Sequence, residues 1–310
     1  MGDRRIVLVT RKTRLEELVQ KYNTAGQARF YIEHLGQDFS DYLDEHDNYK
    51  RMADRILSSI AGSNKYIHVD RSYLSSFLFD DSDMVYVLGQ DGLVANTMKY
   101  LKSQPVVAIN PDPSRWAGIL LPFTCSQALV DPEKLIGTSR ERNITLGKVS
   151  LNDGQEMLAV NDFYIGQSSH ISSRYQIFHR DRSESQSSSG IIVSTGVGST
   201  GWLKSVIAGA RGISSALGNG KLSSGEDGAY PWDADYLKFA VREPYASPVS
   251  GAGIVFGEVH DDSPLRIVSG MSDRGVIFSD GMEGDYLEFS SGMTASIGIA
   301  GHKAKLLQPL

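Results

Sequence analysis

Short apolar runs separated by helix-like segments mark the first 130 residues of the chain. Residues 5–10 (Arg-Ile-Val-Leu-Val-Thr) predict a buried strand, and the runs at 66–69, 83–88 and 105–109 predict three more. A helix is expected over residues 93–101, between the last two of these strands. Strands that alternate with helices are typical of an α/β domain with a parallel sheet.

Residues 13–60 carry the 3.6-residue spacing of helices and contain few breakers. We expect two or three helices here, with breaks near Gly26 and Gly36. Two groups of apolar residues are each spaced like one helical face: Leu15, Leu18, Val19 and Tyr22, and Phe30, Tyr31 and Leu35.

After about residue 130 helix signals become sparse, while Gly, Ser and β-branched residues become more frequent. Turn signals separate the apolar runs, which favours an antiparallel β domain. Strands are expected at 144–151, 156–165, 175–179, 191–195, 237–241, 253–256, 265–268, 275–279 and 286–290. Asp280-Gly281 fits a hairpin turn. The serine-rich residues 183–189 and the Gly/Ser-rich residues 218–228 are expected to be loops.

Composition narrows the class of protein. The chain has 310 residues, of which 22% are charged, and a net charge of −6 without the basic footprint of a nucleic-acid-binding protein. Cys125 is the one cysteine, which excludes an intrachain disulfide and a cysteine-cluster zinc site. The seven histidines lack metal-ligand spacing, and no apolar run approaches the ~20 residues of a membrane helix. We expect a cytoplasmic enzyme or binding protein with no membrane partner.

The most informative motif follows the strand predicted at 83–88. Gly89, Asp91 and Gly92 form a Gly-x-Asp-Gly turn at the carboxyl end of that strand, where ligands bind in open α/β sheets. Small residues let the backbone approach a phosphate, and the following helix N-terminus favours an anion. A carboxylate at Asp91 makes sense if it takes a proton or helps to hold a metal. Alternatively, Asp91 is only the N-cap of the helix.

Two further motifs lie in the β-rich part. Residues 190–202 run from an apolar strand into a Gly/Ser/Thr loop before a helix, so the hydroxyls of Ser199 and Thr200 could bind phosphate, ribose or an adenine edge. Asn161 and Asp162 stand side by side at the head of a β run and could read a ribose hydroxyl and an adenine edge. The alternatives are a turn with a helix cap and an ordinary strand-entry turn.

In this order, the three elements resemble the NAD kinase family, whose members carry Gly-Gly-Asp-Gly, then Asn-Glu, then Thr-x-Thr-Gly-Ser-Thr-Ala-Tyr. The counterparts here are Gly89-Gln90-Asp91-Gly92, Asn161-Asp162 and the stretch from Thr195 to Trp202. The closest likeness is to the mitochondrial-type branch, and it also covers residues 107–118, 165–174 and 188–190, so that the resemblance spans nearly the whole chain.

The resemblance implies a fold and a reaction. The fold is an N-terminal Rossmann-like α/β domain, over residues 1–135, and a C-terminal antiparallel β domain that binds dinucleotide, over residues 136–310; a return of the last residues to the first domain stays open. The reaction is transfer of a phosphoryl group from ATP or polyphosphate to the adenosine 2′-hydroxyl of NAD, giving NADP, with Mg²⁺ bridging the donor phosphates. Members are often homodimers or tetramers.

Roles follow residue by residue from the same resemblance. Asp91 would be the catalytic residue that accepts or orients the hydroxyl proton. The nucleotide-binding positions would be Gly89, Gln90, Gly92, Asn161, Asp162, Thr195, Gly198, Ser199, Thr200 and Trp202. Asn110, Asp112 and Arg115 follow the strand predicted at 105–109, so they are candidates for the cleft, although a Pro-rich turn explains them equally well. No protein metal ligands are expected.

Two departures from the family pattern bear on activity. Gln90 replaces the second glycine of the family motif, and a glutamine would be strained there if the position needs a positive φ. Asp162 is one methylene shorter than the usual glutamate. They motivate one alternative, a catalytically weak NAD(P)-binding or regulatory protein. The other is a lipid or sugar kinase that shares the Gly-Gly-Asp-Gly loop.

Overall fold

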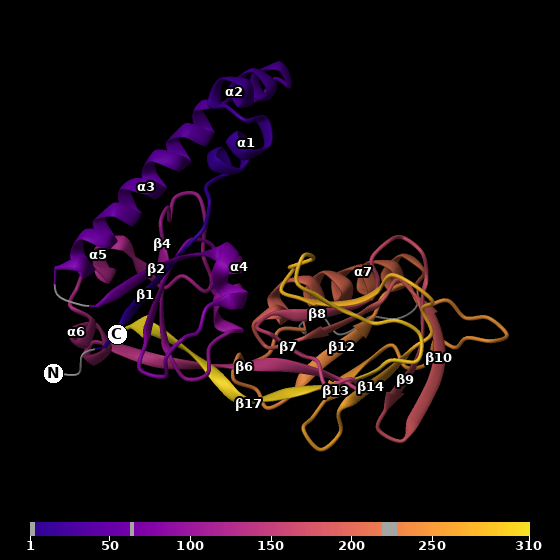
Figure 1. Cartoon of the computed structure of the whole chain (residues 1–310). Helices are drawn as coiled ribbons and strands as arrows, with labels where there is room; N and C mark the ends of the chain where they lie inside the picture. The colour runs from indigo at the N-terminus through magenta and orange to yellow at the C-terminus, as the bar shows by residue number, and fades with distance from the viewer. Residues whose placement is uncertain (1–3, 63–64, 219–227) are drawn as a thin grey trace. The chain divides into compact units, whose positions relative to one another are not determined.

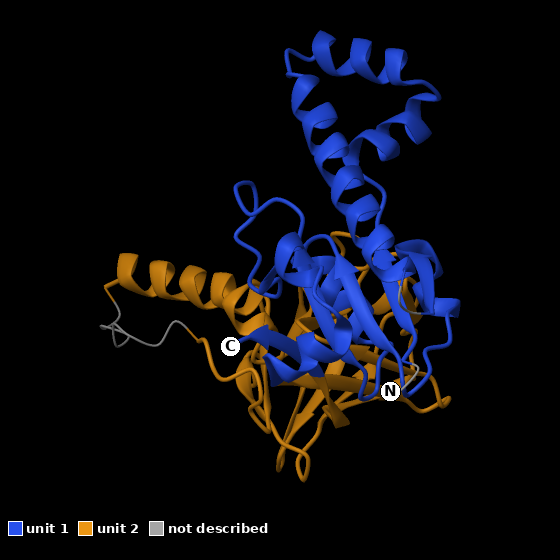
Figure 2. Cartoon of the chain, turned by 90° about the vertical axis from the view of Figure 1, so that its left-hand side faces the viewer, with its two compact units in different colours: residues 1–142, 305–310 blue, residues 143–304 orange. Residues whose placement is uncertain are grey.

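The computed structural model describes residues 4–62, 65–218 and 228–310, and the chain divides into two compact units (Figures 1 and 2). Unit 1 comprises residues 1–142 and 305–310, and unit 2 comprises residues 143–304. Most of the loop expected at 218–228 lies outside the described residues.

Unit 1 is built on a parallel sheet. Its strands are β1 (Ile6–Thr10), β2 (Tyr66–Asp70), β3 (Met84–Leu88), β4 (Pro105–Asn110) and the short β5 (Phe123–Thr124). They pair in parallel in the order β5, β4, β3, β1, β2. All residues of β1 and β3 are buried, as the apolar runs predict for strands covered on both faces.

Some helices of unit 1 pack on this sheet, and others pack against each other away from it. They are α1 (Arg14–Tyr22), α2 (Ala25–His34), α3 (Ser40–Ala61), the 3-10 helix η1 (Arg71–Ser76), α4 (Asp91–Met98), α5 (Cys125–Ala128) and α6 (Pro132–Gly137). Tyr49, Ile56 and Ile60 of the long α3 pack in the same core as β1 and β3. Figure 1 shows α1 and α2 beside the first turns of α3, away from the sheet.

One predicted helical face is buried, while the other is mostly exposed. Leu15 is buried against Ala28 and Ile32 of α2, with Leu18, Val19 and Tyr22 beside it. In contrast, the Phe30, Tyr31 and Leu35 side chains are 73%, 46% and 58% exposed. Their spacing is helical, but the buried side of α2 is formed by Ala28 and Ile32, and of the three it is Tyr31 that contacts α1, through the Tyr22 ring with centroids 4.7 Å apart.

Unit 2 consists of antiparallel strands, which confirms the predicted mixture of an α/β and a β-rich part. Its strands are β6 (Ser139–Leu151), β7 (Glu156–Ala159), β8 (Asp162–Gln167), β9 (Ser173–His179), β10 (Arg182–Ser188), β11 (Ile191–Ser194), β12 (Leu237–Val241), β13 (Phe256–Val259), β14 (Leu265–Ser269), β15 (Gly275–Ser279), β16 (Tyr286–Glu288) and β17 (Thr294–Pro309). β6 begins in unit 1 and β17 ends there, where Lys305 and Leu306 pair with β4.

Two groups of these strands enclose the core of unit 2. One is ordered β13, β12, β11, β8, β15, β16, and the other β10, β9, β14, β17. Phe163, Phe239 and Ile277 from the first group pack with Ile177, Ile267 and Ile297 from the second. The described helices of unit 2 are the 3-10 helix η2 (Gly198–Thr200) and α7 (Trp202–Ala216).

The strand expected at 156–165 is in fact two strands. β7 ends at Ala159 and β8 starts at Asp162, because the main-chain nitrogens of Val160 and Asn161 both donate to the Asp280 carboxylate instead of to a neighbouring strand. The carboxylate lies about 120 positions away in the chain, so periodicity alone does not reveal the break.

The prediction of a loop at 183–189 is wrong, because β10 covers residues 182–188. Ser188 and Gln186 are buried on alternate positions, and both bond the Tyr175 hydroxyl of β9. A strand whose buried side is polar does not show the apolar alternation of a β pattern. The strand expected at 253–256 also lies later, at Phe256–Val259, and β17 is not predicted by the sequence.

Candidate functional site

The Gly-x-Asp-Gly motif forms the turn between β3 and α4 in unit 1. Gln90 is the N-cap of α4 and Asp91 its first helical residue, so the interpretation of Asp91 as N-cap is wrong. Gln90 has φ −114° and ψ 165°, an extended conformation that needs no glycine. A Cβ on Gly92 would meet no atom within 4 Å, so packing within the described residues does not require a glycine there.

Asp91 is held by main-chain hydrogen bonds. The nitrogens of Leu120 and Ile119 donate to its Oδ1 and Oδ2, at 2.8 and 3.2 Å. The carboxylate is only partly buried. Each carboxylate oxygen has a second lone pair, so the group remains able to accept a proton in a fixed orientation.

Asn110, Asp112 and Arg115 shape the loop that follows β4. The Asn110 amide donates to Trp116 O at 2.9 Å and accepts from the main-chain nitrogen of Asp112 at 3.0 Å. Arg115 pairs with Asp112 at 3.5 Å and with Asp41 at 2.5 Å. These contacts agree with the turn interpretation of the three residues, the alternative that the sequence left open.

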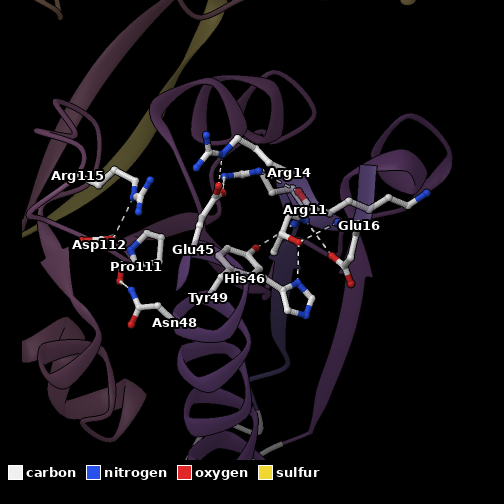
Figure 3. A network of polar contacts seen from close by, with 12 residues as sticks. Arg11, Arg14, Glu16, Glu45, His46, Asn48, Tyr49, Pro111, Asp112 and Arg115 are labelled. Carbon is white, nitrogen blue, oxygen red and sulfur yellow. Dashed lines mark hydrogen bonds and ion pairs between the residues drawn. The ribbon is translucent and has the colours of Figure 1, made fainter. Parts of the chain in front are cut away.

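A polar network behind the turn was not predicted. In Figure 3 the side chains of Arg11 and Arg14 both reach the carboxylate of Glu45, which is 2% exposed and accepts from both guanidinium groups. Arg14 and Arg115 also donate to Asp41, and these hydrogen bonds hold the pKa of that carboxyl below its ordinary value. The sequence gives no local signal for it, because Arg11 and Glu45 are 34 positions apart.

Tyr49 joins this network to the strand before the turn. Its hydroxyl donates to Leu88 O at 2.8 Å and accepts from the main-chain nitrogen of Arg11 at 3.0 Å. Burial raises the pKa of Tyr49 to about 12. The ends of β1 and β3 are therefore tied to α3 by one buried, neutral hydroxyl.

In unit 2, the loop after β11 is closed by its own hydroxyls. Buried Thr195 donates to Val160 O and accepts from Gly198 N, and buried Ser199 donates to Gly196 O at 2.6 Å. These two hydroxyls hold the loop and are not exposed to a ligand. Thr200, by contrast, is exposed, and its hydroxyl donates to Val197 O at 3.2 Å.

Two glycines of this loop are required by close main-chain approaches. A Cβ on Gly196 would lie 2.0 Å from Pro231 O, and a Cβ on Gly198 would lie 2.0 Å from Asn161 O. Asn161 O also accepts from Thr195 N at 2.9 Å. The loop and the Asn161 backbone are thus fixed against each other, which brings together two of the motifs seen in the sequence.

Asp162 is a buried carboxyl next to another acid. It is 8% exposed, and burial together with the nearby Asp280 raises its pKa to about 7. Asp280 has φ 55° and Gly281 φ 69°, as the predicted hairpin turn requires. The sequence revealed this turn but not the bonds of Asp280 to Val160 and Asn161.

A cavity of about 690 Å³ opens on unit 2 beside Trp202. The Trp202 ring stacks on Tyr164, with ring centroids 5.9 Å apart, and the Arg242 guanidinium lies 5.4 Å from the Trp202 centroid. Gln167 lines the cavity and is 7% exposed, with its Oε1 unpartnered among the described residues. The cavity is therefore lined by aromatic rings, an arginine and a buried amide, the mixture typical of a small-molecule site.

The described residues contain no group of three His, Cys, Asp or Glu side chains arranged to hold a metal ion. Across the same residues, each helix is too short or too polar to cross a membrane.

Comparison with solved structures identifies the fold. No family model and no curated protein matches the sequence. An NAD kinase from Archaeoglobus fulgidus in complex with ATP is similar over 98% of this chain and 94% of its own, with 13% identity and a TM-score of 0.58. Yeast NADH kinase complexed with NADH is similar over 100% of this chain and 85% of its own, with 14% identity and a TM-score of 0.56. The chain therefore shares the two-domain fold of these kinases.

Proposed function

We propose that the protein is an NAD kinase that transfers a phosphoryl group from ATP to the adenosine 2′-hydroxyl of NAD. The observation that carries this proposal is Asp91, oriented by two main-chain hydrogen bonds at the start of α4, in a fold shared with two dinucleotide kinases. Since one fold can host many functions, the support for this activity comes mainly from Asp91 and the residues around it.

Unit 1 would supply the proton acceptor and the approach to phosphate. Phosphoryl transfer needs positioning, charge neutralisation and a place for the hydroxyl proton. Asp91 takes that proton as the 2′-oxygen bonds to phosphorus and the bond to the leaving nucleoside diphosphate breaks. Gly92, exposed and without packing neighbours on the side of its missing Cβ, leaves room for phosphate oxygens near the helix N-terminus.

Unit 2 would hold the dinucleotide. The Trp202 ring and Arg242 line the cavity and offer an aromatic and cationic surface for a heteroaromatic ring. Asn161 and Thr200 retain partly or fully exposed side chains for ribose or adenine contacts. Thr195, Gly198 and Ser199 would contribute by shaping the loop.

Mg²⁺ is compatible with the turn without a protein cage. This ion keeps several waters and is usually bound by substrate phosphates and one or two carboxylates. Because Asp91 is assigned to the proton, the donor phosphates and water would hold the ion. When bound, the ion would neutralise charge on the donor phosphates.

We also carry four expectations of the sequence into the proposal. Polyphosphate is an alternative donor to ATP, the protein acts in the cytoplasm, and it forms homodimers or tetramers. The functional division falls at residues 1–135 and 136–310.

A dinucleotide-binding protein without turnover is the second candidate. It is favoured by one observation, because the bonds of Asp91 to Ile119 and Leu120 give this carboxylate a structural use that does not require catalysis.

Turnover measured beside equilibrium binding separates the two candidates. NAD is incubated with ATP and Mg²⁺, NADP is quantified with an NADP-specific dehydrogenase, and NAD binding is followed by calorimetry. NADP formation supports the kinase. Binding of NAD without NADP formation, with ATP and with polyphosphate as donors, supports the binding protein.

A further inference from the structure

The loop of residues 111–121, between β4 and β5, is shaped by contacts near its middle. The buried Asn110 amide holds Trp116 O at 2.9 Å. Gly118 has φ +64°, and a Cβ there would lie 2.9 Å from Asn110 Nδ2. The main chain between Trp116 and Gly118 therefore wraps closely around the Asn110 side chain.

This loop sets the direction of the Asp91 carboxylate. Ile119 and Leu120, directly after Gly118, give their main-chain N–H groups to the two oxygens of Asp91. The Leu120 side chain is 2% exposed and anchors this end in the protein. A shift of the loop would consequently turn or release the carboxylate.

Gln90 joins the loop to the end of β1. When its amide oxygen faces the neighbouring donors, Oε1 accepts from Arg11 Nη2 and from Trp116 Nε1, each at 3.3 Å. Arg11 is fixed in turn by Glu45, at 3.1 Å, and lies over the Tyr49 ring. Because Gln90 is the residue before Asp91, the middle of the loop at Trp116 and its later part at Ile119 and Leu120 are both held from the same turn.

We propose that Gln90 is a positioning residue, which through Trp116 keeps the loop where Ile119 and Leu120 orient Asp91. This rests on the proposed kinase function for its catalytic consequence. The glutamine then supports the reaction, in contrast to the sequence expectation that its replacement of the second glycine weakens activity. Its extended backbone agrees with this, since the substitution brings no left-handed strain.

Three variants test the proposal. Gln90→Met keeps the side-chain length without the acceptor, Trp116→Phe keeps a ring without the donor, and the third combines both. Ser114→Ala is the control, because Ser114 is exposed on the same loop and bonds only Asp112 among the described side chains. Amide hydrogen exchange of Ile119 and Leu120 and the separate values of kcat and KM for NAD and ATP are measured.

Trp116→Phe, which loses one hydrogen bond, is expected to lower kcat about three- to tenfold, and Gln90→Met, which also loses the contact with Arg11, at least as much, with KM nearly unchanged. Exchange at Ile119 and Leu120 should become faster. The double variant should be no worse than Gln90→Met alone, because Gln90→Met already removes the contact with Trp116 that Trp116→Phe breaks. Unchanged exchange, additive losses, or a rise of kcat in Gln90→Met would overturn the proposal. If no kinase activity exists in the wild type, the exchange data still decide whether Gln90 holds the loop.

Discussion

The carboxylate of Asp280 accepts a hydrogen bond from the main-chain nitrogen of Asn161 at 2.6 Å. This bond ends β7 and aligns Asn161 for the loop that follows β11. The same negative charge acts on the neighbouring Asp162, which is buried and has a pKa of about 7. One acid therefore fixes the backbone of the Asn-Asp motif and changes the ionisation of its second residue.

Asp162 should make stability fall as pH rises. Its pKa rises from 3.8 to about 7 in the folded protein, so between these values the folded state holds a proton that the unfolded state has released. At about 1.4 kcal/mol for each pKa unit, the free energy of unfolding loses about 4 kcal/mol between pH 4 and pH 8. Asp162→Asn should match the wild type at pH 4 and exceed it at pH 8 in urea unfolding. Equal differences at both pH values would contradict this.

Gly198 and Gly92 should respond to alanine in opposite ways. Gly198→Ala places a Cβ 2.0 Å from Asn161 O and should cost at least about 2 kcal/mol of unfolding free energy. Gly92→Ala meets no atom, so stability should hold or rise by up to about 1 kcal/mol, while turnover falls because the methyl group crowds the phosphates. Thermal unfolding and kcat/KM measure the two effects. Full activity in Gly92→Ala would argue against phosphate approaching this residue.

Glu45 should be worth far more to stability than a surface acid. Glu45→Gln leaves Arg11 without its carboxylate in a buried setting and should cost about 3 kcal/mol. Glu33→Gln is the control, since the Arg29–Glu33 pair is exposed and should cost less than about 0.5 kcal/mol. Chemical denaturation of both variants measures the two losses of unfolding free energy. Similar losses would show that the buried network around Glu45 stabilises the protein no more than an exposed ion pair does.

Trp202 should contribute to dinucleotide affinity through its ring. Trp202→Ala removes the surface that stacks on Tyr164 and faces Arg242, and the Kd for NAD should rise about tenfold. Trp202→Phe keeps a ring and should stay within about threefold of the wild type. Calorimetric titration with NAD provides both values; an unchanged Kd in Trp202→Ala would remove this residue from the binding site.

The sequence predicts elements whose burial is apolar and local. β1, β3 and β4 are continuous apolar runs covered on both faces, so period and length suffice to find them. β10 escapes because its buried positions are Gln186 and Ser188, which are satisfied by a tyrosine hydroxyl on the next strand. Polar burial of this kind depends on partners that a pattern of apolar residues does not show.

The candidate site also has features that the sequence predicts and features that it does not. The turn around Asp91 and the loop after β11 are visible as glycine-rich breaks after apolar strands. The arginines around Glu45, the bonds of Asp280 to Asn161 and the contact of Gln90 with Trp116 join residues 26 to 119 positions apart. Such contacts come from the fold and leave no spacing in the sequence.

The most direct test of the account is the rate of NADP formation from NAD, ATP and Mg²⁺ by the wild type and by Asp91→Asn. Loss of a general base predicts a kcat lower by about 10²–10⁴-fold in the variant, with NAD affinity nearly retained. NADP formation by Asp91→Asn at the same rate as by the wild type would contradict the assignment of Asp91 as the proton acceptor.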